Sequence, residues 1–477
     1  MSKSQTSGNA IQRLVDGARP APLWHDDPDW LTVGAAATSE LPTEPLDVVI
    51  IGAGFSGLWT AIWLSKIAPE WRIAIVDASG VGAGASSRNG GWCSAVMPMS
   101  PTDIAARLGT EAATQLYAEA ITNVDEIGSF IRSAGIDCSW RKGGTLVNAS
   151  HAAQVKGVRS EFESWRSLGF ERHVRWLDPE SLRSMINLAP TMGGYVQDFC
   201  ASIHPARLVA GLARSVRARG VSIHAPITVQ RIETGAVVTS LGHIHTRHTV
   251  RATEAFTPSI RQYRREVLPV YSLMVATEPL RADVRAALNW ADGLTFTDGG
   301  ELVVYAQLTG DGRLAFGGRG AHTPYASRPI DTVALSRTVH ERLLRTMHDF
   351  FPATRDALVT HRWGGAVAVH RDWWPAIRID ESVSTADHRH VSIGGYVGDG
   401  VAASHLLARR AAELLAAPRS LPHTLASIPA RRWEPEPMRF IGSNAMISLI
   451  SFIDRRESRR LRRSRFLRRL LSAFLGA

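Results

Sequence analysis

Three glycines and one acidic residue near the start of the chain have the spacing of a dinucleotide-binding site. Gly52, Gly54 and Gly57 form the pattern GxGxxG, and Asp77 follows 20 residues after the last of them. In this pattern the first glycine permits a tight turn, the second lets backbone approach a pyrophosphate, and the third lets a helix pack closely on a strand. A carboxylate at Asp77 could accept hydrogen bonds from both ribose hydroxyls of an adenosine. The four residues predict dinucleotide binding without separating FAD from NAD.

A strand, a helix and a second strand must position these groups. Residues 48–51 are a continuous apolar run, which is typical of a parallel strand buried on both faces. The helix then begins at Phe55 and Ser56, where free N–H groups and the positive end of the helix dipole would face the phosphates. Residues 72–76 predict the second strand, which ends at Asp77.

A second glycine- and serine-rich loop follows, with the sequence GVGAGASSRNGGWCSA over residues 80–95. Here the chain resembles the D-amino acid oxidase (DAO) superfamily of FAD enzymes, whose members carry a similar GASxRNGG element. The branch that it resembles most holds gamma-glutamylputrescine oxidases and aminophosphonate oxidoreductases. The resemblance implies that the loop lies along the pyrophosphate and ribityl chain of FAD. The implied cofactor contacts are Ser86, Ser87, Arg88, Asn89, Gly90 and Gly91.

Later segments resemble further landmarks of the same family in the same order. Residues 201–232 predict an amphipathic helix followed by a strand, and the resemblance places the backbone of Val229 near the adenine. Residues 390–415 predict a strand, a glycine turn and a helix whose N-terminus, by the resemblance, points at the flavin. Gly398, Gly400 and Val401 are the contacts implied there.

The resemblance runs from about residue 47 to residue 415 and implies an α/β fold. A Rossmann-like FAD-binding domain of the glutathione-reductase type would be interleaved with an α+β substrate domain built on a mixed sheet. The expected FAD-binding segments are 46–110, 196–258 and 361–417, the expected substrate-domain segments are 111–195 and 259–360, and 1–45 and 418–477 form an N-terminal arm and a C-terminal extension.

Two departures from sarcosine-oxidase-like relatives bear on chemistry. Those relatives attach FAD through a cysteine in the stretch matching 361–377, but this chain has no cysteine after Cys200, so noncovalent FAD is expected. They also bind the substrate carboxylate and activate oxygen with lysines, and here no lysine follows Lys156. The electron acceptor is therefore oxygen, a quinone or another protein. For an anionic substrate group, the bidentate fork of arginine makes three residues candidates: Arg319, Arg362 and Arg371.

The chemistry that the resemblance implies is hydride transfer from a carbon bearing an amine to flavin N5, followed by imine hydrolysis. The expected substrate is a small amine or amino acid, with an aminophosphonate or a gamma-glutamyl amine as specific options. Two alternatives stay open: a flavin dehydrogenase of a hydroxy acid or polyol phosphate, and a membrane-associated electron-transfer protein with a structural flavin. The residues identify no catalytic side chain and no metal site.

The charge of the chain is concentrated at its C-terminal end. With 45% hydrophobic and 21% charged residues, the composition excludes a disordered chain. The formal net charge is +10, but residues 455–469 hold nine arginines and one glutamate, so the rest is nearly neutral. Residues 455–475 predict a basic amphipathic helix for an anionic membrane surface, and no nucleic-acid partner is expected. No segment is long and apolar enough to span a bilayer, so a cytoplasmic protein, peripheral on the inner membrane face, is expected.

Overall fold

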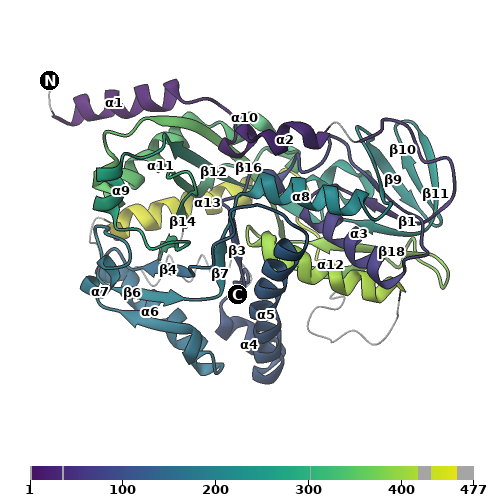
Figure 1. The fold of residues 1–477 in the computed structure, drawn as a ribbon, viewed down its shortest axis with the longest axis horizontal. Coiled ribbons are helices and arrows are strands. Elements are labelled where there is room, and N and C mark those ends of the chain that lie inside the picture. The colour runs from purple at the N-terminus through teal and green to yellow at the C-terminus, as the bar shows by residue number, and fades with distance from the viewer. Residues whose placement is uncertain (1–2, 35–36, 301, 417–430, 459–477) are drawn as a thin grey trace.

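Two large β-sheets with helices packed against them make up the computed structural model (Figure 1). The structure describes residues 3–34, 37–300, 302–416 and 431–458. A small two-stranded sheet, formed by β3 (Trp92–Ser94) and β7 (Cys200–Ser202), is the third sheet of this described part.

The first sheet contains the predicted dinucleotide-binding strands. Its strands, in spatial order, are β17 (Ala376–Ile379), β18 (Arg389–Gly394), β11 (Gly242–Arg251), β1 (Leu46–Ile51), β2 (Ile73–Val76) and β8 (Ser222–His224), and β10 (Ala236–Thr239) and β9 (Val229–Glu233) extend β11 as a hairpin. The strands from β18 to β8 pair in parallel. This confirms the parallel strands expected on either side of the glycine pattern, and β2 is buried throughout.

Three helices cover the first sheet: α3 (Phe55–Ile67), α8 (Pro205–Arg217) and α12 (Gly400–Ala416). Helix α3 is apolar around its whole circumference, which requires burial on every side, and it packs between β1, α8 and α12 (Figure 1). A Cβ atom at Gly57 would lie 1.8 Å from the Gly52 carbonyl oxygen. Only glycine therefore lets α3 approach the turn that precedes it this closely.

The second sheet is mixed, as expected for the substrate domain. Its strands, in spatial order, are β16 (Val359–His370), β12 (Val267–Thr277), β15 (Leu314–Ala321), β14 (Val304–Leu308), β13 (Thr295–Asp298), β4 (Thr145–Asn148), β6 (Gly194–Gln197) and β5 (Val174–Leu177). Strands β4 and β13 pair in parallel, and the other neighbours are antiparallel.

Strand β16 corrects one expected domain boundary. Residues 361–417 were expected in the FAD-binding domain, yet β16 pairs with β12 along its length and therefore belongs to the second sheet. The chain returns to the first sheet only at β17. The physical reason is backbone hydrogen bonding between strands, because β12 supplies partners along the whole of β16. Strand β6 likewise places residues 196–197 in the second sheet.

The remaining helices connect the sheets or pack on the second one. They are α1 (Lys3–Gly17), α2 (Pro28–Val33), α4 (Pro101–Leu108), α5 (Thr110–Ser133), α6 (Ala152–Ser167), α7 (Pro179–Arg183), α9 (Ala282–Leu288), α10 (Asp331–Ala334), α11 (Arg337–Phe350) and α13 (Met438–Ser458). The N-terminal segment is folded: α1 packs on α11, and α2 packs on α8.

Helix α13 contains the apolar run at residues 445–453 and packs beside β15 (Figure 1). The Ser443 and Thr323 hydroxyls are 2.7 Å apart, and the Asn444 side chain bonds both backbone groups of Thr323. Most of the predicted basic helix, residues 459–477, lies outside the described residues, so membrane binding stays a prediction. None of the helices that the structure describes is long and apolar enough to cross a membrane.

Candidate active site

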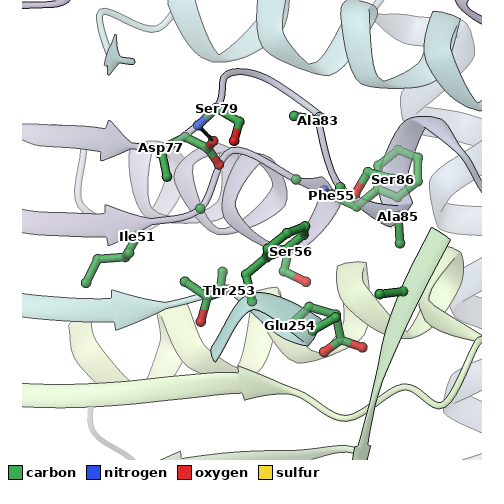
Figure 2. Close-up of a pocket in the computed structure, with 18 of the residues that line it drawn as sticks. Ile51, Phe55, Ser56, Asp77, Ser79, Ala83, Ala85, Ser86, Thr253 and Glu254 are labelled. Atoms are coloured by element: carbon green, nitrogen blue, oxygen red, sulfur yellow. Dashed lines mark hydrogen bonds between the residues drawn. The ribbon is translucent and has the colours of Figure 1, made fainter. Parts of the chain in front are cut away.

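The glycine pattern opens into a cavity of about 310 Å³ between the first sheet and the start of α12 (Figure 2). The residues predicted to contact FAD that line it are Gly52, Gly54, Phe55, Ser56, Asp77, Ser86, Asn89, Val229, Gly398, Gly400 and Val401. Both α3 and α12 begin at this cavity, so the positive ends of two helix dipoles face it. This arrangement suits a ligand with a pyrophosphate.

Asp77 is held rigidly at one wall of the cavity, where Figure 2 shows its bond to Ser79. Its Oδ2 accepts the Ala53 N–H at 2.8 Å, and its Oδ1 accepts the N–H groups of Ser79 and Gly80, both at 2.8 Å. A carboxylate has about four acceptor positions. Three backbone donors leave room for about one more, so Asp77 suits one ribose hydroxyl rather than the expected two.

The two glycine-rich segments meet at Ser86. The Phe55 N–H donates to the Ser86 Oγ at 2.9 Å, and a Cβ atom at Gly54 would lie 2.8 Å from the same oxygen. Gly52 has a φ of +111°, and a Cβ atom on it would lie 2.5 Å from the Ala252 carbonyl oxygen. Side chains at these glycines would crowd the turn at the cavity. Their absence fits the close approach of a dinucleotide to the protein backbone.

The N-terminal segment holds the loop at residues 85–91 from outside. The Trp24 indole N–H donates to the Asn89 carbonyl at 2.9 Å, and the His25 ring lies 2.8 Å from the Ser87 hydroxyl. Ser87 is fully buried and also bonds the Gly82 carbonyl at 2.8 Å. Ser87 therefore fixes the loop and does not line the cavity, which corrects its expected role as a cofactor contact.

The second sheet holds the same loop from the other side. The Trp363 indole N–H donates to the Arg88 carbonyl at 2.9 Å, and the Gln307 side chain donates to the Gly90 carbonyl at 2.8 Å. A Cβ at Gly91 would lie 2.0 Å from the Gln307 Nε2. Gly91, like Gly57, lines neither cavity and allows close packing instead. No sequence pattern predicts these tryptophan and glutamine contacts.

A second cavity of about 420 Å³ lies against the second sheet and joins the first. The two cavities share five lining residues: Ala85, Asn89, Val367, Gly398 and Val401. Arg88, Gly90 and Arg319 line the second cavity, and the Arg319 guanidinium bonds the Val397 carbonyl beside Gly398. Of the three arginines proposed for the substrate, Arg319 is the one beside this join.

The other two arginine candidates line neither cavity, which corrects their assignment. Arg362 donates to the Leu335 carbonyl at 3.1 Å. Arg371 pairs with Glu434 at 3.2 Å and lies over the Trp433 ring. Both guanidinium groups are thus engaged in packing of the second sheet and the C-terminal segment.

Two half-buried carboxyl groups near the join had not been predicted. Glu254 accepts the Gly395 N–H at 2.9 Å and the Ala368 N–H at 3.3 Å, and burial raises its pKa to about 7. Burial also raises the pKa of Asp399 to about 6, although the nearby Arg319 lowers it. Two sequence signals could have found them. Glu254 is an acid inside an apolar segment, and Asp399 is an acid between Gly398 and Gly400.

Comparison with known proteins agrees with this geometry. Residues 47–414 match the family described as DAO, FAD dependent oxidoreductase. The chain is 28% identical over 375 residues to the gamma-glutamylputrescine oxidoreductase of Escherichia coli, covering 77% of this chain and 83% of the relative. It is 26% identical over 383 residues to the probable oxidoreductase OrdL of Haemophilus influenzae, covering 78% and 83%.

Solved structures share the fold. Glycine oxidase from Geobacillus kaustophilus superimposes with a TM-score of 0.66 at 20% identity, covering 79% of this chain and 96% of that one. L-amino acid deaminase from Proteus vulgaris superimposes with a TM-score of 0.63 at 17% identity, covering 81% and 97%. With the family match over most of the chain, the cavity that suits a dinucleotide is an FAD site. The chain belongs to the DAO family of FAD-dependent oxidoreductases.

Proposed function

We propose that this enzyme oxidises a C–N bond of a small amine or amino acid, a class that includes gamma-glutamyl amines and aminophosphonates. The observation that carries the proposal is the join of the two cavities, where Arg319 and Asp399 lie beside Gly398. A substrate amine bound there can pair with the Asp399 carboxyl group. A substrate carboxylate or phosphonate can pair with the Arg319 guanidinium. The name of the Escherichia coli relative supports an amine substrate.

The proposed reaction needs little from the protein beyond positioning. When bound, FAD supplies a two-electron acceptor at its N5. The C–H bond beside the substrate nitrogen breaks with its electron pair, the nitrogen loses a proton, and a C=N bond forms. Water then releases an aldehyde or keto acid with ammonia or an amine. Only a neutral amine reacts in this way. Arg319 lowers the pKa of an amine beside it, and the Asp399 carboxylate has the opposite effect.

Two features support noncovalent FAD. Among the lining residues that the structure describes, neither cavity has a cysteine or a histidine. Cys93, Cys138 and Cys200 are all buried away from both cavities. Acid precipitation should therefore leave the flavin in the supernatant, whereas yellow colour in the pellet would show a covalent link.

The test of the proposed function is reduction of the enzyme's own flavin under argon. Small amines, amino acids and aminophosphonates are compared with hydroxy acids and polyol phosphates. Bleaching of the oxidised flavin by at least one compound with a C–N bond, and not by the hydroxy compounds, is the expected result. Bleaching by the hydroxy compounds alone would overturn the proposal.

A further inference from the structure

The second cavity has two chemically different ends. The flavin end contains the residues shared with the first cavity, the two arginines Arg88 and Arg319, and one acid, Asp399. The far end is formed by α6, β6 and the end of β13, and none of its lining residues belongs to the first cavity. Among the residues described there, the acidic side chains are Glu161 and Asp298, and no arginine, lysine or histidine lines this end.

One face of helix α6 runs from Glu161 to the end of β13, where Asp298 lies. Gln154, Val158 and Glu161 follow the spacing of one helix face. The Gln154 side chain donates to the Asp298 Oδ2 at 3.5 Å, and Val158 contacts Gly299, the next residue. Glu161 therefore lies on the face of α6 that Asp298 packs against.

Neither acid has a cationic partner. None of the salt bridges between described residues includes Glu161 or Asp298. Burial raises the pKa of Glu161, and the Tyr195 side chain opposes this effect. Burial also raises the pKa of Asp298 to about 7, and the negative charge of Asp454 on α13 raises it further. Two carboxyl groups thus line an end of the cavity at which no described lining residue supplies a positive charge.

A second, independent observation at the far end also calls for a donor. The Gln197 side chain is 3% exposed and lines the cavity, and its Oε1 accepts no hydrogen bond. Tyr195, two residues earlier on β6, points to the same face of the strand and lines the same cavity. A buried acceptor without a partner costs about 1–3 kcal/mol, so a ligand that donates to it gains affinity.

We propose that the far end binds a protonated second nitrogen, so that the substrate is a linear diamine whose other amino group is oxidised at the flavin end. An ammonium group offers three donors and one positive charge, and the carboxyl groups of Glu161 and Asp298 and the Gln197 Oε1 are acceptors at different points of this end. The flavin end has two arginines, Arg88 and Arg319, against one acid, Asp399, so its lining favours a neutral amine over an ammonium group. This inference rests on the proposed amine oxidation and adds the substrate's second charged group. The products are an amino aldehyde and ammonia, and the far ammonium is unchanged.

The test measures binding to the oxidised holoenzyme under argon by titration calorimetry. Hexamethylenediamine is compared with hexylamine, which has the same chain without the second nitrogen, and with aminocaproate, whose far group is negative. The diamine should bind at least tenfold more tightly than hexylamine, a difference of about 1.4 kcal/mol. Aminocaproate should bind more weakly than hexylamine. Equal affinity for diamine and monoamine would overturn the proposal, and this comparison needs no variant.

Variants then locate the effect. Glu161→Gln and Asp298→Asn should each lower the ratio of the diamine and hexylamine affinities severalfold. Glu163→Gln is the matched control, because Glu163 is on the same helix, is exposed and pairs with Arg166 at 2.9 Å. It should keep the wild-type ratio. A ratio retained in both cavity variants would overturn the assignment to the far end.

The same samples separate this inference from the proposed function. If the diamine binds selectively but never bleaches the flavin, the far-end site stands and amine oxidation is wrong. If hexylamine and the diamine bind equally and both bleach the flavin, amine oxidation stands and the far-end site is wrong.

Discussion

At the scale of single residues, the site combines one acid that its motif reveals with several that only the folded chain reveals. Asp77 is recognisable because its distance from the glycine pattern is set by one strand–helix–strand unit. Glu254 and Asp399 become buried partners of the site only when η5 (Glu254–Ser259) and the turn before α12 meet. Their local sequence marks them as unusual acids, but no local pattern encodes that meeting, so their position beside the site could not be predicted.

Replacing Asp77 with alanine should weaken FAD binding, because the ribose loses a charged acceptor and three backbone N–H groups lose theirs. A hydrogen bond to a charged group contributes about 1.5–3 kcal/mol, so the Kd of the apoprotein for FAD should rise at least tenfold. Fluorescence titration with FAD measures it. Glu70→Ala, an exposed acid of the same unit, is the control. An unchanged Kd in Asp77→Ala would show that the motif has been misread.

Glu254 should give the protein a distinct pH dependence. Its pKa is raised from 4.5 to about 7 in the folded protein, so between these values the folded state keeps a proton that the unfolded state releases. Its contribution to folding stability therefore falls as pH rises through this window. Glu254→Gln removes this titration, and its free energy of unfolding relative to wild type should increase by about 1–3 kcal/mol from about pH 5 to about pH 8. Urea unfolding at both pH values measures the difference, and a constant difference would contradict the assignment.

At the scale of elements, local signals predicted much of the first sheet and little of what surrounds the flavin loop. Strands β1 and β2 and helices α3, α8 and α12 occur where apolar periodicity and glycine turns indicated. Strand β16 was assigned to the wrong sheet, because its partner β12 is far away in sequence. The contacts from residues 24–25 to the loop at 85–91 are likewise set by tertiary packing.

The N-terminal segment should therefore influence FAD affinity although it lies outside the family match. Trp24→Phe keeps the ring but leaves the Asn89 carbonyl without its donor, and the Kd for FAD should rise about fivefold, as for the loss of about 1 kcal/mol. Trp290→Phe is a matched control, because that indole bonds the Leu294 carbonyl far from the flavin loop. It should lower stability without changing the Kd. Equal FAD affinity in the two variants would refute the role of Trp24.

At the scale of the whole molecule, the two cavities lie where the two sheets meet. The first sheet carries the cavity with the glycine pattern, the second carries the cavity that we propose for the substrate, and the loop at residues 85–91 is bonded from both sides. Within the described part of the chain, no lysine lines either cavity, and the two cations are Arg88 and Arg319.

The lack of a lysine among the described lining residues bears on the electron acceptor. We propose that the acceptor is a quinone or a partner protein. Without a lysine beside the flavin to activate oxygen, reoxidation in air-saturated buffer should be slower than reduction by the substrate. A soluble quinone should restore turnover. Stopped-flow absorbance measures both half-reactions, and reoxidation by oxygen as fast as reduction would show that the enzyme is an oxidase.

The central claim is that the enzyme oxidises a carbon–nitrogen bond. An anaerobic single turnover of the holoenzyme with the amine that bleaches its flavin, followed by quenching and product analysis, tests it most directly. We predict one aldehyde or keto acid, and one ammonia or amine, for each flavin reduced. Reduced flavin together with a product that keeps its C–N bond and is oxidised elsewhere would contradict the account.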